Sequence, residues 1–155
     1  MSGDRGTLLF VHEGATFRVA DGAQPPKAGS LLFCRHLHAE PGARVLEIGT
    51  GIGLAAVRLA LAGARVIATD VVEAAVRCAR DNAILNGVAD RVEVRRGDAF
   101  APAAGLTFDL ICTSPPQMPT PPDRERADAM AAADNGGRDG WSLLDRVIAG
   151  APAHL

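Results

Sequence analysis

The chain has 155 residues, of which 48% are hydrophobic and 22% charged, and its formal net charge is -2. This length and composition predict one globular domain, and the near-neutral charge gives no overall electrostatic footprint for nucleic acid. No apolar run approaches the roughly 20 residues that span a bilayer, and the first ten residues lack the apolar core of a secretory signal, so we expect a cytoplasmic protein without membrane contact.

The three cysteines are Cys34, Cys78 and Cys112, and they lie far apart within apolar segments. None belongs to a Cys-x-x-Cys pair, which is the usual spacing of a metal or redox site. We therefore predict buried thiols and no metal centre.

Helical and strand patterns alternate along the chain, which predicts an α/β fold with a Rossmann-like, doubly wound, mainly parallel sheet. Ahead of this alternation, residues 7–20 predict a hairpin with its turn at Glu13 and Gly14. We accordingly assign residues 1–29 to an N-terminal hairpin or lid and residues 30–155 to the main domain.

The main domain begins with a helix predicted over residues 30–38, with Ser30 as its N-cap. The later strands are expected within residues 44–48, 65–70, 91–100 and 108–113, and the later helices within residues 54–63, 71–86 and 141–148. Helical spacing predicts two buried faces. One comprises Val72, Ala75, Val76, Ala79 and Ala83, and the other Trp141, Leu144 and Ile148.

The segment VLEIGTGIG, residues 45–53, places Gly49, Gly51 and Gly53 between a predicted strand and a helix. Glycines at such a turn let the backbone approach a ligand closely. The spacing differs from the G-x-G-x-x-G of dinucleotide sites, and Glu47 would repel a pyrophosphate but suit an amino group. A ligand with an ammonium group is favoured, and a nucleotide-dependent oxidoreductase is the weaker interpretation.

Two further acids end predicted strands. Asp70 ends the second strand, where a carboxylate can bind both ribose hydroxyls of a nucleoside. Thr69 and Asp70 also have the chemistry of a helix N-cap, which is the alternative. Asp98, followed two residues later by Phe100, ends the third strand and could bind the edge of an adenine, or it could simply cap a turn.

The fourth strand ends in TSPPQMP, residues 113–119. Consecutive prolines fix their own φ and restrict the residue before each, so the carbonyls of Ser114 and Pro115 point in set directions. An amide or amino nitrogen held by these carbonyls and the Ser114 hydroxyl would be well positioned for reaction. The alternative is that the prolines only terminate the strand.

From about residue 20 to 149, these motifs together resemble class I S-adenosylmethionine-dependent methyltransferases, specifically the HemK-type small methyltransferases that modify nitrogen. That family has Asn-Pro-Pro-Tyr and a GG-x-DG segment where this chain has SPPQ and GGRDG. The resemblance implies S-adenosylmethionine as cofactor and methyl transfer to an amide or amino nitrogen of a protein side chain or a small molecule. The implied cofactor residues are Glu47, Gly49, Thr50, Gly51, Ile52, Gly53, Asp70, Val71, Asp98, Ala99 and Ser114, and the implied acceptor residues are Ser114, Pro115, Pro116 and Gln117.

Two positions depart from the family motif. Ser114 lacks the two-sided hydrogen bonding of asparagine and resembles the Ser-Pro-Pro of cytosine-N4 DNA methyltransferases. Gln117 replaces the aromatic residue that stacks on a flipped base, which argues against a nucleobase acceptor. An adenine-N6 or cytosine-N4 methyltransferase, or a non-catalytic S-adenosylmethionine-binding domain, are the alternatives that stay open.

The resemblance also implies a seven-stranded sheet, whereas this sequence supplies the strands only up to the fourth of that order. We expect the C-terminal strands to be missing, either because the chain is a fragment or because another chain supplies them. The fourth strand would then be a long, apolar edge through which the domain could self-associate.

Overall fold

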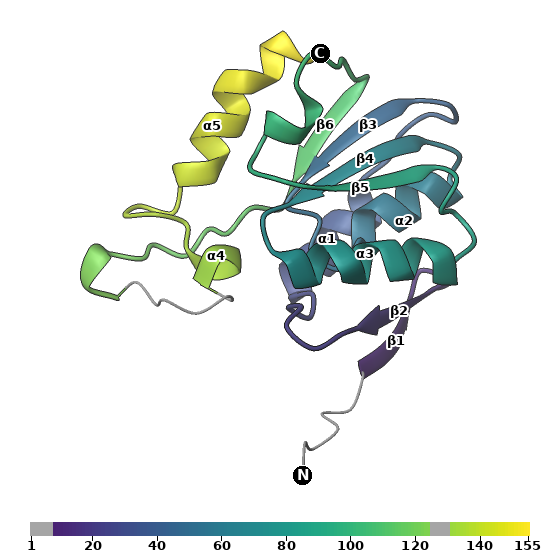
Figure 1. Cartoon of the computed structure of the whole chain (residues 1–155), viewed down its shortest axis with the longest axis horizontal. Helices are drawn as coiled ribbons and strands as arrows, with labels where there is room; N and C mark the ends of the chain where they lie inside the picture. Colours follow the sequence, from purple (N-terminus) through teal and green to yellow (C-terminus); the bar gives the residue numbers. More distant parts are fainter. Residues whose placement is uncertain (1–7, 125–130) are drawn as a thin grey trace.

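The central sheet contains four parallel strands in the order β5-β4-β3-β6 (Figure 1). The computed structural model describes residues 8–124 and 131–155. In sheet order the strands are Val92–Arg96, Arg65–Asp70, Arg44–Ile48 and Leu110–Thr113. Crossover segments connect them, as parallel pairing requires. The predicted α/β fold with a mainly parallel, doubly wound sheet is confirmed.

Helices lie on both faces of this sheet (Figure 1). On one face are α1 (Ala28–His36), α2 (Leu54–Leu61) and α3 (Glu73–Leu85). On the other is α5 (Ser142–Gly150), which is followed by the 3-10 turn η3 (Ala151–Ala153). Three shorter helical segments are η1 (Ala101–Ala103), η2 (Pro122–Arg124) and α4 (Ala131–Asp134).

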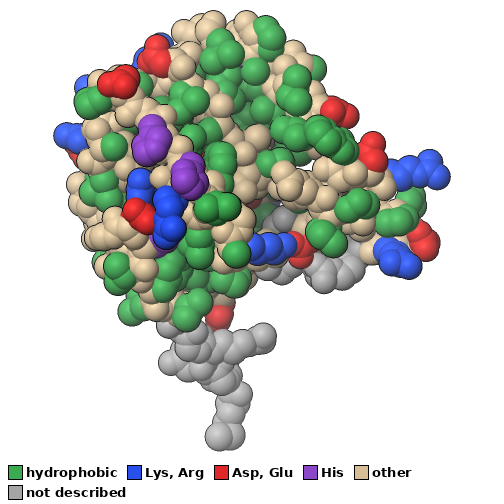
Figure 2. All heavy atoms as spheres, turned by 180° about the vertical axis from the view of Figure 1, so that it is seen from behind, with side chains coloured by type: hydrophobic (Ala, Val, Ile, Leu, Met, Phe, Trp, Pro, Cys, Tyr) green, Lys and Arg blue, Asp and Glu red, His purple; other side chains and the backbone are tan. Residues whose placement is uncertain are grey.

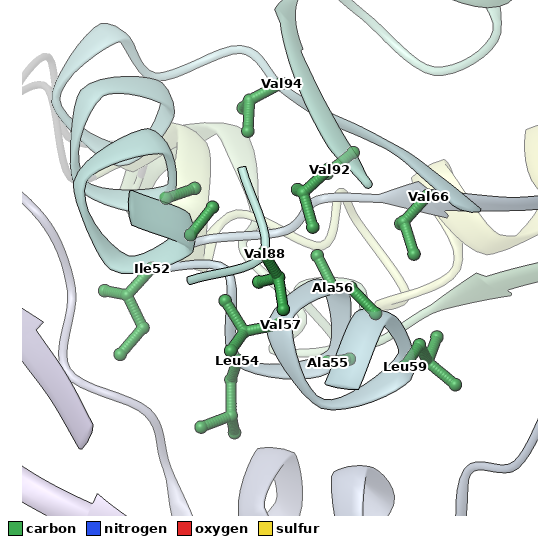
Figure 3. Packing of buried hydrophobic residues seen from close by; sticks show 14 of the residues in the cluster. Ile52, Leu54, Ala55, Ala56, Val57, Leu59, Val66, Val88, Val92 and Val94 are labelled. Atoms are coloured by element: carbon green, nitrogen blue, oxygen red, sulfur yellow. The ribbon is translucent and has the colours of Figure 1, made fainter. Parts of the chain in front are cut away.

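Each face of the sheet has its own hydrophobic core. Because neighbouring residues of a strand point to opposite faces, Val45 joins one core and Leu46 the other. The larger core packs α2 and α3 against β4 and β5, and Figure 3 shows part of it: Ile52, Leu54, Val57, Leu59, Val66, Val92 and Val94. The smaller core comprises Leu46, Ile48, Ala103, Phe108 and Val147. The central strand β3 is therefore buried from both sides.

The predicted N-terminal hairpin is present as β1 (Leu8–His12) and β2 (Ala15–Val19), which pair antiparallel. Glu13 and Gly14 form its turn with φ of 51° and 82°. Residues 1–7 of the predicted lid lie outside the described residues. Phe17 is fully buried in the larger core, so the hairpin packs on the helices, and the division of the chain at residue 29 stays a prediction.

Asn82 joins the hairpin to the rest of the fold from a fully buried position on α3. Its Oδ1 accepts a hydrogen bond from the Arg18 backbone N–H at 2.8 Å. Its Nδ2 donates to the carbonyls of Arg18 at 2.9 Å and Ile52 at 2.8 Å. One amide side chain thereby satisfies β2 and the loop after β3 together.

The predicted N-cap at Ser30 is wrong, because α1 begins two residues earlier, at Ala28. Pro25 and Pro26 fix their own φ, and Lys27 at the cap position keeps an extended backbone without a side-chain cap bond. Ser30 therefore lies inside the first turn. The helix also ends at His36 rather than at residue 38.

The predicted buried face is largely confirmed in α3 but not in α5. Four of the five residues predicted for the α3 face are buried, namely Ala75, Val76, Ala79 and Ala83, and Val72 precedes the helix. In α5 the predicted face is wrong, because Trp141 and Ile148 are 51% and 60% exposed. Leu143 and Val147 pack on the sheet instead. The smaller core lies on their side of the helix.

Strand β6 lies at an edge of the sheet, as predicted, but it is short rather than long. Its ladder with β3 begins at Leu110, and just before it the Phe108 N–H donates to the His154 carbonyl at 2.8 Å. The Asp109 carboxylate accepts a bond from the Arg44 N–H at 2.8 Å at this point. Self-association through the edge stays a prediction.

All three cysteines are buried and form no disulfide, which confirms the prediction of buried thiols. Burial raises the pKa of Cys34 to about 11 and also raises that of Cys112. Within residues 8–124 and 131–155, no helix combines the length and apolar character needed to cross a membrane.

Candidate active site

The carboxyl ends of the four parallel strands meet at one edge of the sheet. Ile48 at the end of β3 is in register with Thr69 of β4 on one side and Thr113 of β6 on the other. The loops that follow these strands therefore emerge side by side. In open α/β sheets this edge, where the strand order reverses, is where ligands bind.

A cavity of about 370 Å³ opens at this edge. Figure 2 shows the surface hollowed beside the segment that projects from the main body of the molecule. Of the residues predicted for the site, those that line the cavity are Glu47, Gly49, Thr50, Gly51, Ile52, Asp70, Val71, Asp98, Ala99, Ser114, Pro115, Pro116 and Gln117. Residues predicted from separate motifs thus share one cavity.

Gly53 is the predicted residue that does not line the cavity, and its place behind the loop explains why it is glycine. Its φ is +83°, and a Cβ there would lie 3.1 Å from the Cα of Ala79. A larger residue would push α2 away from α3. Gly53 fixes the course of the glycine loop without lining the cavity.

The end of β4 fixes the shape of this loop. The backbone N–H groups of Gly49 and Thr50 both donate to the Thr69 carbonyl, at 2.8 Å and 2.9 Å. The Gly51 N–H donates to Asp70 Oδ2 at 2.9 Å. These three bonds to the end of β4 fix the backbone of the loop.

Glu47 is a carboxyl group buried in the wall of the cavity, only 5% exposed. Its Oε2 accepts a hydrogen bond from the Thr50 hydroxyl at 2.7 Å. Its pKa is raised to about 7, chiefly by burial and against hydrogen bonds from Thr50 and the Ala56 backbone, and the charge of Asp70 contributes to the rise. A cationic ligand group nearby would favour the ionised form.

The Asp70 carboxylate is fixed at the start of α3. Besides the bond from Gly51, its Oδ1 accepts one from the Val72 N–H at 2.9 Å. The Thr69 hydroxyl does not cap the helix, since it donates to the Glu47 carbonyl at 3.3 Å. A carboxylate oxygen can accept more than one bond, so Asp70 can cap the turn and still bind ligand hydroxyls.

Asp98 lies at the cavity with its carboxylate already engaged, since Oδ2 accepts a hydrogen bond from Arg146 Nη2 at 2.6 Å. The next residue, Ala99, has a φ of 45°, an unusual conformation for a side chain with a Cβ. Phe100 does not face the cavity. Its ring stacks on that of His154, with the centroids 4.6 Å apart.

The Ser-Pro-Pro-Gln segment is anchored at both ends. The Thr113 hydroxyl donates to the Ile48 carbonyl at 2.8 Å, next to the glycine loop. Beyond the segment, the Gly136 N–H donates to the Met118 carbonyl at 3.0 Å. A Cβ at Gly140 would lie 2.5 Å from the Gln117 carbonyl oxygen, so the GGRDG segment needs glycine to pack against this backbone.

The far wall of the cavity is formed by residues of the predicted N-terminal lid and by residues for which the sequence predicts no role. Gln24 Nε2 and Lys27 Nζ donate to Asp134 Oδ1 at 2.9 Å and 2.8 Å, which joins the loop before α1 to α4. The sequence carries one signal for this wall, namely the two consecutive prolines of QPPK, which resemble the prolines of the Ser-Pro-Pro-Gln segment. The remaining lining residues are Gly22, Pro25, Pro26, Gly29, Ser30, Phe33, Leu54, Ala55, Thr69, Val72, Ala75, Gly97, Met118 and Leu143, with Ile48 at the end of β3.

Comparison with known families identifies this arrangement. Residues 22–128 match the family model described as the methyltransferase small domain. The chain belongs to this family. The match covers the glycine loop, both acids after the strands and the Ser-Pro-Pro-Gln segment, so the resemblance found in the sequence is confirmed.

Curated relatives of this methyltransferase domain carry more specific names. A Methanocaldococcus jannaschii protein described as an N5-glutamine methyltransferase is 33% identical over 96% of this chain and 74% of its own length. The release factor glutamine methyltransferase of Gloeobacter violaceus is 37% identical over 79% of this chain. The alignment with the second covers 44% of that protein, so the domain spans less than half of it.

Solved structures show the same fold. A Pyrococcus horikoshii protein described as a transferase superposes with a TM-score of 0.58 at 22% identity, over 68% of this chain and 41% of that one. The aligned part therefore spans less than half of that protein.

The cofactor of this methyltransferase domain is S-adenosylmethionine, and the cavity fits it. The volume of about 370 Å³ lies within the range of small-molecule sites. Two carboxyl groups, Glu47 and Asp70, offer acceptors to an ammonium and to ribose hydroxyls. The backbone at Gly49 and Gly51 adds no side chain to the space between them, and a Cβ at either would meet nothing within 4 Å.

Proposed function

We propose that this domain is an N-methyltransferase that modifies the side-chain amide nitrogen of a glutamine in a protein. The observation that carries the proposal is that the Ser-Pro-Pro-Gln segment lines the same cavity as Glu47 and Asp70. The acceptor nitrogen and the methyl donor would therefore meet in one space. The names of the two curated relatives support an amide acceptor.

In this proposal Ser114 and Pro115 orient the acceptor. The prolines hold the preceding carbonyls in fixed directions, so an amide N–H can donate to the Pro115 carbonyl while the Ser114 hydroxyl contacts the amide oxygen. A planar amide nitrogen is a weak nucleophile. Hydrogen bonds that localise its lone pair, together with fixed orientation, supply the activation.

Glu47 and Asp70 hold the donor. Glu47 pairs with the ammonium, Asp70 accepts bonds from the ribose hydroxyls, and Asp98 and Ala99 contact the adenine. When bound, S-adenosylmethionine would supply an electrophilic methyl group and retain the electron pair of the S–C bond on sulfur, while the acceptor nitrogen held by Ser114 and Pro115 would lose one proton to solvent.

The donor half of the proposal is tested by calorimetric titration of the chain with S-adenosylhomocysteine, which needs no acceptor. We expect micromolar binding that Asp70→Ala reduces at least about tenfold, since the variant loses ligand bonds and the Gly51 anchor. The control is Asp81→Ala, an exposed aspartate of α3 that does not line the cavity. Equal affinity in wild type and Asp70→Ala would refute the assignment of Asp70.

The acceptor half is tested by transfer of a labelled methyl group to a glutamine-containing peptide. A matched peptide with glutamate in place of glutamine is the control, and an oligonucleotide tests the nucleobase alternative. We expect Ser114→Ala to keep its affinity for S-adenosylhomocysteine and to lower the rate about tenfold or more. Unchanged transfer would remove Ser114 from the mechanism.

A further inference from the structure

We propose that α5 couples the two ends of the active-site cavity, and that Arg146 is the positioning residue through which the cofactor end acts on the acceptor end. This inference rests on the proposed function, because it assigns the adenine to the side of Asp98 and the acceptor to the side of Gln117. Contacts at the two ends of the helix carry it.

The first turn of α5 is attached to the acceptor segment. The Ser142 N–H donates to the Gly136 carbonyl at 3.0 Å, and the Gly136 N–H in turn donates to the Met118 carbonyl at 3.0 Å. Leu143 itself lines the cavity. A Cβ at Gly137 would lie 2.6 Å from the Ser142 Cβ, so this junction has little room to adjust. Movement of the helix start would therefore displace the backbone around Gln117.

The rest of α5 is attached to the adenine side. Arg146 donates to Asp98 Oδ2 at 2.6 Å, from a side chain that is 51% exposed. A Cβ at Gly150 would lie 2.5 Å from the Phe100 ring, so the helix end is in close contact with that ring. The same ring stacks on His154 just beyond the helix. A shift of the loop from Asp98 to Phe100 would therefore act on α5 through both contacts.

The helix is short and stiff enough to transmit such a shift. Its nine residues extend for about 13 Å. Its packing on the sheet comes from Leu143 and Val147, and Trp141 and Ile148 are mostly exposed. A narrow attachment of this kind opposes a small rotation or slide less than a fully buried helix would.

Arg146 links this helix to the ligand through one carboxylate. Arg146 engages Asp98 Oδ2, and the same carboxylate can still accept a bond from the adenine amine at Oδ1. An adenine amine bound to this carboxylate would shift Asp98, and Arg146, which is paired with Oδ2, would transmit the shift to α5. Binding of the cofactor would in this way set the acceptor segment before the acceptor enters.

The test uses the only tryptophan of the chain, Trp141, which lies at the acceptor end of α5 and is half exposed. S-adenosylhomocysteine is titrated into the whole chain while tryptophan emission and its quenching by acrylamide are recorded. Binding is measured in parallel by calorimetry. We expect both tryptophan signals to change with the same midpoint as the calorimetric isotherm.

Arg146→Met keeps the length of the side chain and removes its charge. We expect it to weaken S-adenosylhomocysteine binding about two- to fivefold, as for an exposed ion pair, and to abolish most of the Trp141 response at saturating ligand. Arg146→Lys should restore part of the response. Arg77→Met removes a comparably exposed arginine that pairs with Glu73 on α3, and it should leave the response unchanged.

The outcomes separate the two proposals. Binding without any Trp141 response in the wild type, or a full response in Arg146→Met at saturation, would overturn the coupling and leave the proposed function standing. Absence of binding in the folded wild-type chain would overturn the proposed function and the coupling with it. An equal loss of response in Arg77→Met would show a general effect of charge instead.

Discussion

Glu47 is the residue whose chemistry most directly links the fold to the ligand. Its pKa is raised from 4.5 to about 7, chiefly by burial, so the folded chain binds a proton that the unfolded chain has released between those values. The contribution of Glu47 to the free energy of unfolding should therefore be highest below pH 4.5 and should fall as the pH rises to about 7. The loss is about 3 kcal/mol in order of magnitude.

Glu47→Gln tests this dependence, because glutamine can still accept the Thr50 bond but cannot ionise. Denaturant unfolding at about pH 5 and about pH 8 should show that the wild type loses about 3 kcal/mol more than the variant over this interval. Parallel pH dependences in the two proteins would contradict the raised pKa.

A bound ammonium should reverse the protonation of Glu47. We expect S-adenosylhomocysteine binding near pH 6 to release up to about one proton in the wild type and fewer in Glu47→Gln. Calorimetry in two buffers of different ionisation enthalpy measures the difference. The same proton release in both proteins would assign it to another group.

Residue types alone predict Glu47 and Asp70 as ligand-binding residues, because an acid beside a glycine turn is suited to binding an ammonium group or hydroxyls. They did not indicate Asn82 or Asp134. A polar residue on the apolar face of α3 was a signal for Asn82, but its partners Arg18 and Ile52 are distant in sequence and only the fold brings them together.

At the scale of elements, Asn82 should matter as much as a large core residue. Asn82→Ala would leave the Arg18 and Ile52 groups that it satisfies without partners in a buried place. We expect a loss of about 2–4 kcal/mol in the free energy of unfolding, measured by denaturant titration. Asn86→Ala is the matched control, because Asn86 bonds to Thr16 near the surface and should cost less.

The packing of the GGRDG segment on the acceptor loop yields a second prediction at this scale. Gly140→Ala would bring a methyl group into the Gln117 carbonyl, at a residue whose φ is +87°. The Ser-Pro-Pro-Gln backbone must then shift. We expect methyl transfer to fall at least about tenfold and S-adenosylhomocysteine affinity to fall less, since Glu47 and Asp70 belong to other strands. A proportional loss of both would contradict this separation.

The element pattern of the central sheet was predictable, because each strand and its following helix carry a local periodicity. The predictions that proved wrong concern ends and exposed faces. The capping chemistry of Ser30 predicts a helix start there, but the prolines before Lys27 set the start of α1. Helical spacing predicts a buried Trp141, but the sheet does not contact that face of α5.

For the molecule as a whole, the buried cysteines offer a direct measure of integrity. Burial raises the pKa of Cys34 to about 11, and all three thiols are inaccessible. We expect a thiol reagent to react with native protein only slowly, and with three thiols after denaturation. Fast reaction of one thiol in the native chain would show that its segment opens readily.

The architecture of the cavity explains what sequence could not supply. The glycine loop and the Ser-Pro-Pro-Gln segment are short motifs, so they could be recognised. The wall formed by Gln24 and Lys27 exists only because Asp134, more than a hundred residues later, is folded against them. Arg146 and Asp98 are likewise brought together by the packing of α5.

The residues that line the cavity range from Gly22 to Leu143, so they come from most of the length of the chain. A partly folded form would lose part of this lining, so a bound ligand should stabilise the folded state against global unfolding. A cofactor present at about a hundred times its dissociation constant adds about 2.7 kcal/mol to the free energy of unfolding. When less cofactor is available, a larger fraction of the domain would be unfolded and open to proteolysis. The lifetime of the domain would therefore depend on the cofactor concentration.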